Sequence, residues 1–145
     1  MSKVIIGIDP DSKAHGVAIY NDGKLIELFS MPLPELVNLI DKTSIYKSAS
    51  WSIENVCGMG AVFQQRQTKN KNVNSSMAKR IGMCQQAQTE LQRFLDFYGV
   101  EYKLHKISKT WKKDKKQFEL VTGWKGRSNE DTRSAAYFGW LGLNA

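Results

Sequence analysis

Two apolar segments near the start of the chain, separated by a polar turn, restrict the fold more than any other feature. The first is rich in β-branched residues and predicts a buried strand over residues 4–9, bounded by turn residues. The second predicts a strand over 14–20, and an Asp-Gly turn at 22–23 leads to a third strand over 24–29, because Asp-Gly favours a tight hairpin. Asp9 ends the first strand, which suits a charge at the floor of a cleft, although Asp is also common in simple turns.

A second carboxylate lies in a similar setting further along the chain. Trp51, Ile53 and Val56 predict a strand over residues 49–56, in which Glu54 is an acid among apolar neighbours. Burying such an acid is costly unless it is paired or binds a cation. Two strands that each bring one carboxylate to the same end of a sheet would form an oxygen-rich site suited to Mg²⁺ or Mn²⁺.

The last predicted helix, over residues 129–143, supplies a third candidate acid. Asp131 lies near its start, and a stripe of small and apolar residues further along would let the helix approach the sheet closely. That approach would bring Asp131 towards the other two acids. Asp131 also fits an ordinary helix start, since Ser128-x-x-Asp131 matches a capping box and acids suit the first turn of a helix. Both interpretations stay open from the sequence.

The remaining pattern predicts an α/β fold. Further helices are expected over about 33–41, 76–98 and 109–120, and a further strand over 100–106. Three hairpin-like strands followed by alternating helices and strands predict a mixed sheet covered by helices. The helix over 76–98 carries apolar residues at helical spacing and is interpreted as a core helix. No Pro/Gly/Ser-rich linker divides the chain, so residues 1–145 are expected to form one domain.

Charge and composition narrow the class of partner. The net charge of +7, from 21 Lys and Arg against 14 Asp and Glu, favours a polyanionic partner, although such a charge also serves solubility. The apolar runs are too short to span a bilayer, and there is no signal-peptide pattern, so no membrane association is expected. Cys57 and Cys84 lack metal-site spacing, which indicates reduced thiols in the cytoplasm. His15 and His105 have no ligand partners at a recognisable spacing and are left out of the predicted site.

Two basic segments are candidates for contacts with nucleic acid. The segment over 57–75 is polar, basic and long for a plain connection. Its Arg66, Lys69 and Lys71 are candidates for phosphate contacts, and Phe63 for stacking on bases or wedging between them, unless Phe63 packs on its own domain.

The second basic segment follows the strand over 100–106. Its Lys109, Lys112 and Lys113 are also candidates for phosphate contacts, the alternative being a solvated face.

Four pieces of the chain together resemble the RuvC-type Holliday junction resolvases of the RNase H-like (retroviral integrase) superfamily. The matching pieces are Ile6-Gly7-Ile8-Asp9-Pro10 with Gly16, Ile53-Glu54, Asn74-Ser75-Ser76 with Lys79, Gly82 and Gln85, and Asp131 with Ser134-Ala135-Ala136. The first piece is only moderately specific, because sugar kinases and actin-like ATPases also begin with a Gly-Ile-Asp strand. All four in this order are more specific.

The resemblance implies an RNase H-like domain with a mixed five-stranded sheet and an Mg²⁺-dependent endodeoxyribonuclease activity on four-way DNA junctions. Asp9, Glu54 and Asp131 would be its catalytic residues and would hold two Mg²⁺ ions, for which Mn²⁺ would substitute. The family pattern D-x-x-D-A has a second acid where this chain has Ser134. Glu130 or Ser134 is therefore the candidate for completing the coordination of the metal.

The resemblance also implies an aromatic wedge at Phe63, lysines along the DNA backbone and a homodimer formed through the long helix. A two-fold dimer would present two identical sites for paired symmetric nicks. The host would be a bacterium or a phage-infected cell.

Three other functions remain open from the sequence. One is a different RNase H-like nuclease acting on flaps, branched DNA or RNA–DNA hybrids. Another is an actin-like or sugar-kinase ATPase, although the chain has no second Gly-rich phosphate motif. The last is a noncatalytic nucleic-acid-binding module that uses only the basic surface.

Overall fold

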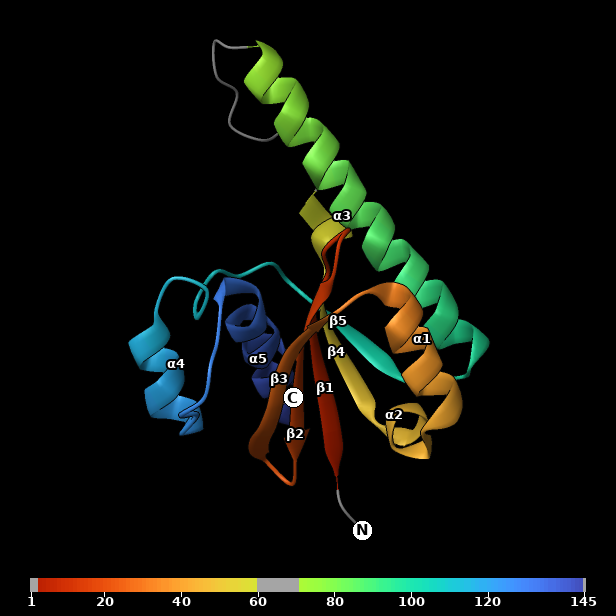
Figure 1. The fold of residues 1–145 in the computed structure, drawn as a ribbon, viewed down its shortest axis with the longest axis vertical. Coiled ribbons are helices and arrows are strands. Elements are labelled where there is room, and N and C mark those ends of the chain that lie inside the picture. The colour runs from red at the N-terminus through yellow and green to blue at the C-terminus, as the bar shows by residue number, and fades with distance from the viewer. Residues whose placement is uncertain (1–2, 60–70, 145) are drawn as a thin grey trace.

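The protein is built around a five-stranded mixed sheet. The computed structural model describes residues 3–59 and 71–144, without the side chains of 59 and 71–73. The strands are β1 (Val4–Asp9), β2 (His15–Asn21), β3 (Lys24–Met31), β4 (Ser50–Glu54) and β5 (Tyr102–His105), in the order β3-β2-β1-β4-β5. The first three pair antiparallel, whereas β4 and β5 join β1 in a parallel arrangement. With helices on both faces (Figure 1), this confirms the predicted α/β class with a mixed five-stranded sheet.

The hairpin between β2 and β3 turns as its sequence predicts. Asp22 and Gly23 have φ angles of 51° and 86°, the positive values that a tight hairpin turn requires. The Asp22 carboxylate accepts a hydrogen bond of 2.8 Å from the backbone N–H of Lys3, and the Asp22 N–H donates to the Lys3 carbonyl at 2.8 Å. The turn is therefore tied to the start of β1, which fixes the register of the first three strands.

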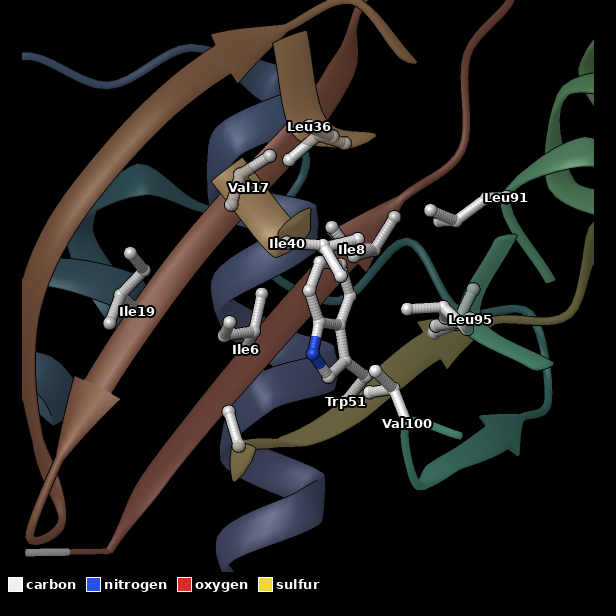
Figure 2. Packing of buried hydrophobic residues seen from close by; sticks show 12 residues of the cluster. Ile6, Ile8, Val17, Ile19, Leu36, Ile40, Trp51, Leu91, Leu95 and Val100 are labelled. Carbon is white, nitrogen blue, oxygen red and sulfur yellow. The ribbon is translucent and has the colours of Figure 1, made fainter. Parts of the chain in front are cut away.

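One face of the sheet is covered by α1 (Leu33–Lys42) and the C-terminal part of α3 (Lys71–Phe97). Side chains that alternate along β1, β2 and β4 form the sheet side of this core, and the helices contribute the other side (Figure 2). The buried members are Ile6, Ile8, Val17, Ile19, Leu36, Ile40, Ala49, Trp51, Ile53, Leu91, Leu95 and Val100. A short helix that the sequence did not predict, α2 (Ser44–Ser48), connects α1 to β4.

The opposite face packs against α5 (Glu130–Leu143), which lies very close to β1 and β2. A Cβ atom at Gly7 would collide with the Ala135 carbonyl oxygen, and one at Gly139 would lie 2.7 Å from the Tyr20 ring. The Tyr20 hydroxyl donates a 2.6 Å hydrogen bond to the Ala136 carbonyl oxygen. The small residues therefore permit the close approach predicted for this helix, and the approach carries the start of α5 to the C-terminal end of β1.

Two predicted helices differ from those observed. The expected helix over 109–120 is wrong, because α4 covers Lys115–Thr122 and the preceding residues form an irregular segment. Asp114 accepts a hydrogen bond of 3.0 Å from the Gln117 N–H and so caps α4, which fixes its start. Trp111, in the irregular segment, is buried against Phe118 and Tyr137.

The long helix α3 begins five residues earlier than predicted, and only its second half is a core helix. Leu91 and Leu95 are fully buried, whereas Met77, Ile81 and Cys84 are only partly covered. Figure 1 shows the N-terminal part of α3 extending past the end of the sheet. The predicted core role is therefore wrong for this part, which lies beyond the packed layers of the described chain. No helix in the described ranges is long and apolar enough to cross a membrane.

Candidate active site

Three carboxylates that are distant in the sequence line one pocket at the edge of the sheet. Asp9 ends β1 and Glu54 ends β4, and because these strands are parallel neighbours their C-terminal ends lie side by side. Asp131 comes from the first turn of α5, which packs on the same face. The pocket has a volume of about 200 Å³ and is also lined by Lys112 and Arg80. The structure thus brings together the three acids selected from the sequence.

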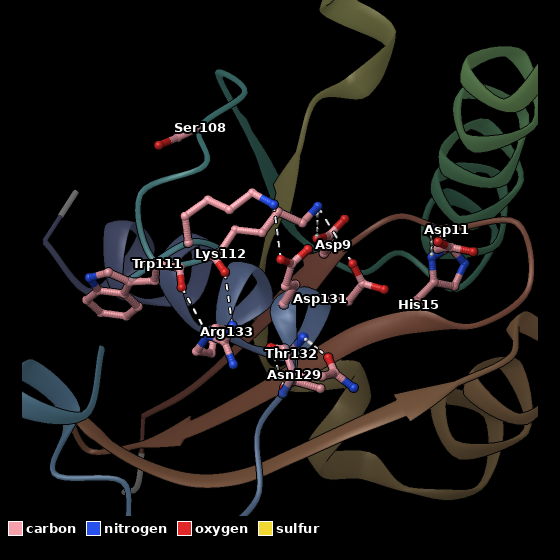
Figure 3. A network of polar contacts seen from close by, with 12 residues as sticks. Asp9, Asp11, His15, Ser108, Trp111, Lys112, Asn129, Asp131, Thr132 and Arg133 are labelled. Carbon is pink, nitrogen blue, oxygen red and sulfur yellow. Dashed lines mark hydrogen bonds and ion pairs between the residues drawn. The ribbon is translucent and has the colours of Figure 1, made fainter. Parts of the chain in front are cut away.

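The Lys112 ammonium group lies between two of these acids (Figure 3). Its Nζ is 3.4 Å from Asp9 Oδ2 and 3.6 Å from Asp131 Oδ1. Burial disfavours the charge of this lysine, but the carboxylates of Asp9, Asp131 and Glu54 outweigh that effect and raise the pKa of Lys112. Lys112 is therefore a permanent cation inside the acid cluster. From the sequence it was expected to contact phosphate, whereas in the structure it contacts the acids of the site.

Asp9 is the most enclosed of the three acids, with 4% of its surface exposed. Burial raises its pKa, and Lys112 and the Ser134 hydroxyl partly oppose the rise. Ser134 is also buried, and neither its Oγ nor Asp9 Oδ2 makes a hydrogen bond of ordinary geometry within the described chain. The Ser134 hydroxyl therefore lies beside Asp9 without a hydrogen bond of its own, while Asp9 Oδ2 has the Lys112 ammonium group as its charged neighbour.

Glu54 is 6% exposed and contacts Asp9. Burial first, and the neighbouring Asp9 charge second, raise the pKa of Glu54 to about 8, although Lys112 acts in the opposite direction. Near neutral pH the pair of carboxylates consequently holds a proton. Two adjacent buried carboxylates share a proton because keeping both charges in a buried site is costly.

The donor atoms of the pocket fit a hard divalent cation. Carboxylate oxygens are the ligands preferred by Mg²⁺ and Mn²⁺, and the Ser134 hydroxyl, which has no hydrogen-bond partner among the described residues, offers further lone pairs beside Asp9. Within the described residues, no three His, Cys, Asp or Glu side chains form a finished metal cage. The Lys112 ammonium group lies between Asp9 and Asp131.

Asp131 is free to face the pocket because other residues cap α5. Asn129 Oδ1 accepts a 2.8 Å hydrogen bond from the Thr132 N–H, and Thr132 Oγ1 accepts one of 2.9 Å from the Asn129 N–H. These reciprocal bonds are the capping box of the helix. The alternative capping box of Ser128 with Asp131 is therefore wrong.

Other residues selected from the sequence lie outside the pocket. Glu130 is exposed and pairs with Lys113 at 3.0 Å, a contact that lowers the pKa of Glu130, so the structure does not bring it to the other acids. Lys109 is exposed on the segment that leads to Lys112.

The remaining predicted DNA contacts are not placed by the structure. Phe63, Arg66 and Lys69 lie outside the described residues. Lys71 starts α3, but its side chain is not described.

Neither histidine lines the pocket. His15 is buried on the other face of the sheet, where its Nδ1 accepts a 3.2 Å hydrogen bond from the Asp11 N–H and burial lowers its pKa to about 4. His105 packs its ring near Phe138, and burial also lowers its pKa. Both imidazoles are therefore neutral near pH 7.

Sequence reasoning missed two arginines near the site. Arg80 lines the pocket from α3, where the apolar spacing drew attention to its neighbours Ile81 and Cys84 instead. Arg133 donates from Nε to the Trp111 carbonyl at 3.1 Å and from Nη2 to the Lys112 carbonyl at 3.0 Å (Figure 3). Arg133 thereby holds the backbone of Lys112 against α5. A contact between a side chain and distant carbonyl groups leaves no signal in the sequence.

A mixed five-stranded sheet with acids at the C-terminal ends of β1 and β4, and a third acid on a helix across the same face, is the arrangement predicted for an RNase H-like domain. No family model and no curated protein matches the chain. Among solved structures, the chain resembles RuvC of Thermus thermophilus in complex with a Holliday junction substrate. That match has a TM-score of 0.58 and 10% identity, and it covers 95% of this chain and 90% of that one.

A second structure of Thermus thermophilus RuvC gives a similar result. Its TM-score is 0.54 with 10% identity, over 94% of this chain and 91% of the other. The chain therefore has a RuvC-like fold over nearly its whole length. At this identity the likeness establishes the fold, and the chemistry has to be argued from the pocket.

Proposed function

We propose that this protein is a divalent-metal-dependent endodeoxyribonuclease that resolves four-way DNA junctions by paired symmetric nicks. The observation that carries the proposal is the meeting of Asp9, Glu54 and Asp131 in one pocket of a RuvC-like fold. One of the similar structures is a RuvC bound to a Holliday junction, which supports branched DNA as the substrate class. The net charge of +7 is consistent with a polyanionic substrate.

Hydrolysis of a phosphodiester needs an activated water, shielding of the phosphoryl charge and stabilisation of the leaving oxygen. Bound Mg²⁺ supplies Lewis-acid stabilisation and a more acidic water. Asp9, Glu54 and Asp131 are the proposed ligands, and Ser134 adds a neutral oxygen beside Asp9. The resemblance to RuvC-type resolvases implies two ions per site, whereas the Lys112 ammonium group already lies among these ligands.

The positive side chains around the pocket are suited to a DNA backbone. Lys112 and Arg80 line the pocket itself, while Lys109 and Lys113 are exposed on the segment beside it. We assign these groups to phosphate contacts, which give affinity without reading sequence. The junction would be held by a homodimer, since two symmetric nicks need two sites related by a two-fold axis.

Replacing Asp9 with Asn tests the proposed chemistry. The unaltered protein is expected to nick a four-way junction with Mg²⁺ and not with EDTA, and Asp9→Asn should abolish nicking while it preserves junction binding. The exposed Asp96→Asn makes the same chemical change on α3 and serves as the matched control, with nicking unaffected. Nicking by Asp9→Asn at the unaltered rate would remove Asp9 from the mechanism.

Competition among substrates tests the substrate class. A four-way junction should outcompete a flap, a linear duplex and an RNA–DNA hybrid in both binding and cleavage. Preferential cleavage of the hybrid or flap would assign the protein to a different RNase H-like nuclease. Sedimentation as a monomer on junction DNA would contradict the proposed dimer.

A further inference from the structure

The position of Lys112 inside the acid cluster has a bearing on how many metal ions the pocket can hold. Its ammonium group contacts Asp9 and Asp131 at 3.4 and 3.6 Å, and only 24% of its side chain is exposed. Arg133 holds the Lys112 carbonyl at 3.0 Å, so the backbone that carries this lysine is tied to α5, the helix that also carries Asp131. The lysine is thus held among the acids from both ends, by its backbone and by its charge.

The charges of the pocket balance one divalent ion. Metal binding requires the Asp9–Glu54 pair to release its proton, after which the three carboxylates carry three negative charges and Lys112 cancels one of them. Arg80 and Asp11 also line the pocket and offset each other, while Ser134 is uncharged. One divalent cation therefore neutralises the cluster, and a second one would leave two excess positive charges beside the buried Asp9.

The geometry leads to the same number. Paired catalytic ions lie about 3.5–4 Å apart and share a bridging carboxylate. Asp9 is the acid placed to bridge two ions, because it contacts Glu54 and its Oδ2 is 3.4 Å from Lys112 Nζ, which also contacts Asp131. The Glu54 carboxylate contacts Asp9, and the Ser134 hydroxyl beside Asp9 has no hydrogen-bond partner among the described residues, so these groups offer oxygen atoms to a cation. Between Asp9 and Asp131, the Lys112 Nζ occupies the position that a second cation would need.

We propose that Lys112 replaces one of the two cations expected from the sequence, so that the pocket binds a single divalent ion on Asp9 and Glu54 while the ammonium group stays between Asp9 and Asp131. This inference rests on the proposed metal-dependent nuclease function. In that role Lys112 supplies the positive charge that the phosphate would otherwise receive from a second ion.

Counting bound Mn²⁺ in the absence of DNA tests the inference. Free Mn²⁺ is measured by room-temperature electron paramagnetic resonance during titration of the full chain, with folding checked by circular dichroism. The unaltered protein should bind one ion, Lys112→Gln should bind two, and Lys112→Arg, which keeps the charge, should bind one. Lys113→Gln removes the neighbouring lysine that pairs with Glu130 outside the pocket, and it should leave the count at one.

Three results would overturn the inference. Two ions in the unaltered protein would show that Lys112 does not hold a cation position, and nicking of a junction by that protein would leave the proposed function standing. One ion in both the unaltered protein and a folded Lys112→Gln would show that no second position exists beneath the lysine. Absence of any bound Mn²⁺ would overturn the inference and the metal-dependent function together. One bound ion without any nuclease activity would instead reject the function alone.

Discussion

Replacing Glu54 with Gln should stabilise the metal-free protein while it destroys the proposed metal site. Glu54 is 6% exposed, and burial together with the Asp9 charge raises its pKa from 4.5 to about 8. The folded protein therefore holds the Glu54 proton more tightly than the unfolded chain does. The stabilisation from that proton is complete below pH 4.5, where both states are protonated, and it is lost as the pH rises towards 8.

The magnitude follows from the size of the pKa shift. Each unit of pKa difference corresponds to about 1.4 kcal/mol, so the metal-free protein should lose on the order of 4–5 kcal/mol of unfolding free energy through Glu54 between pH 4.5 and pH 8. Glu54→Gln has no proton to release. Its stability relative to the unaltered protein should therefore increase steadily over this interval and reach a few kcal/mol at pH 8.

Urea unfolding in EDTA at pH 5, 6, 7 and 8 measures this difference. Titrating groups that do not contact Glu54 contribute equally to both proteins and cancel in the comparison, whereas Asp9, which shares its proton with Glu54, is part of the measured difference. Glu101→Gln, at an exposed position, is the matched control and should give a difference that does not vary with pH. Addition of Mg²⁺ should stabilise the unaltered protein and not Glu54→Gln. A Glu54→Gln difference that is constant from pH 5 to pH 8 would refute the reasoning.

Three further predictions concern packing and DNA contact. Gly139→Ala should lower the unfolding free energy by about 1–3 kcal/mol, because the added methyl group meets the buried Tyr20 ring. Gly82→Ala on α3 meets no neighbouring atom and should raise the unfolding free energy by about 0.5–1 kcal/mol. Urea unfolding measures both changes, and equal effects would contradict the close approach of α5. Trp111→Ala should cost about 3–5 kcal/mol in the same assay, and a loss below 1 kcal/mol would contradict its core role. Phe63→Ala should slow junction cleavage more than it weakens junction binding, as measured by single-turnover kinetics and gel shift, and unchanged cleavage would discard the predicted wedge.

The sheet was predictable because short local patterns of β-branched and turn residues mark its strands. Residues 4–9 combine β-branched residues with a following Pro10, and β1 occupies just these positions. The hairpin at Asp22-Gly23 is equally local, since its positive φ values depend on those two residues. Where the pattern was ambiguous, tertiary packing decided: the segment before Asp114 became an irregular stretch that buries Trp111, instead of the first turn of a helix.

The candidate site was predictable only in part. Acids at strand ends are visible in a sequence, which is why Asp9 and Glu54 were selected and why the structure finds them adjacent. Lys112 comes close to Asp131 only when the chain folds. Lys109, Lys112 and Lys113 lie in one basic segment, so the sequence does not show which of these lysines enters the pocket. Glu130 illustrates the converse error, because two neighbouring acids at a helix start face different directions and only one of them lines the pocket.

Arg133 also connects the two ends of the segment over residues 112–128, which contains α4. Its guanidinium group donates to the Lys112 carbonyl at the start of this segment, and to Ser128 Oγ at 3.2 Å at its end, just before α5. Extra residues inserted at the exposed turn over 125–127, between these two anchors, would lengthen a closed loop without shifting its ends. This part of the chain can therefore vary in length, and with it the reach of its lysines along the proposed DNA substrate, while Asp9, Asp131 and Lys112 keep their spacing.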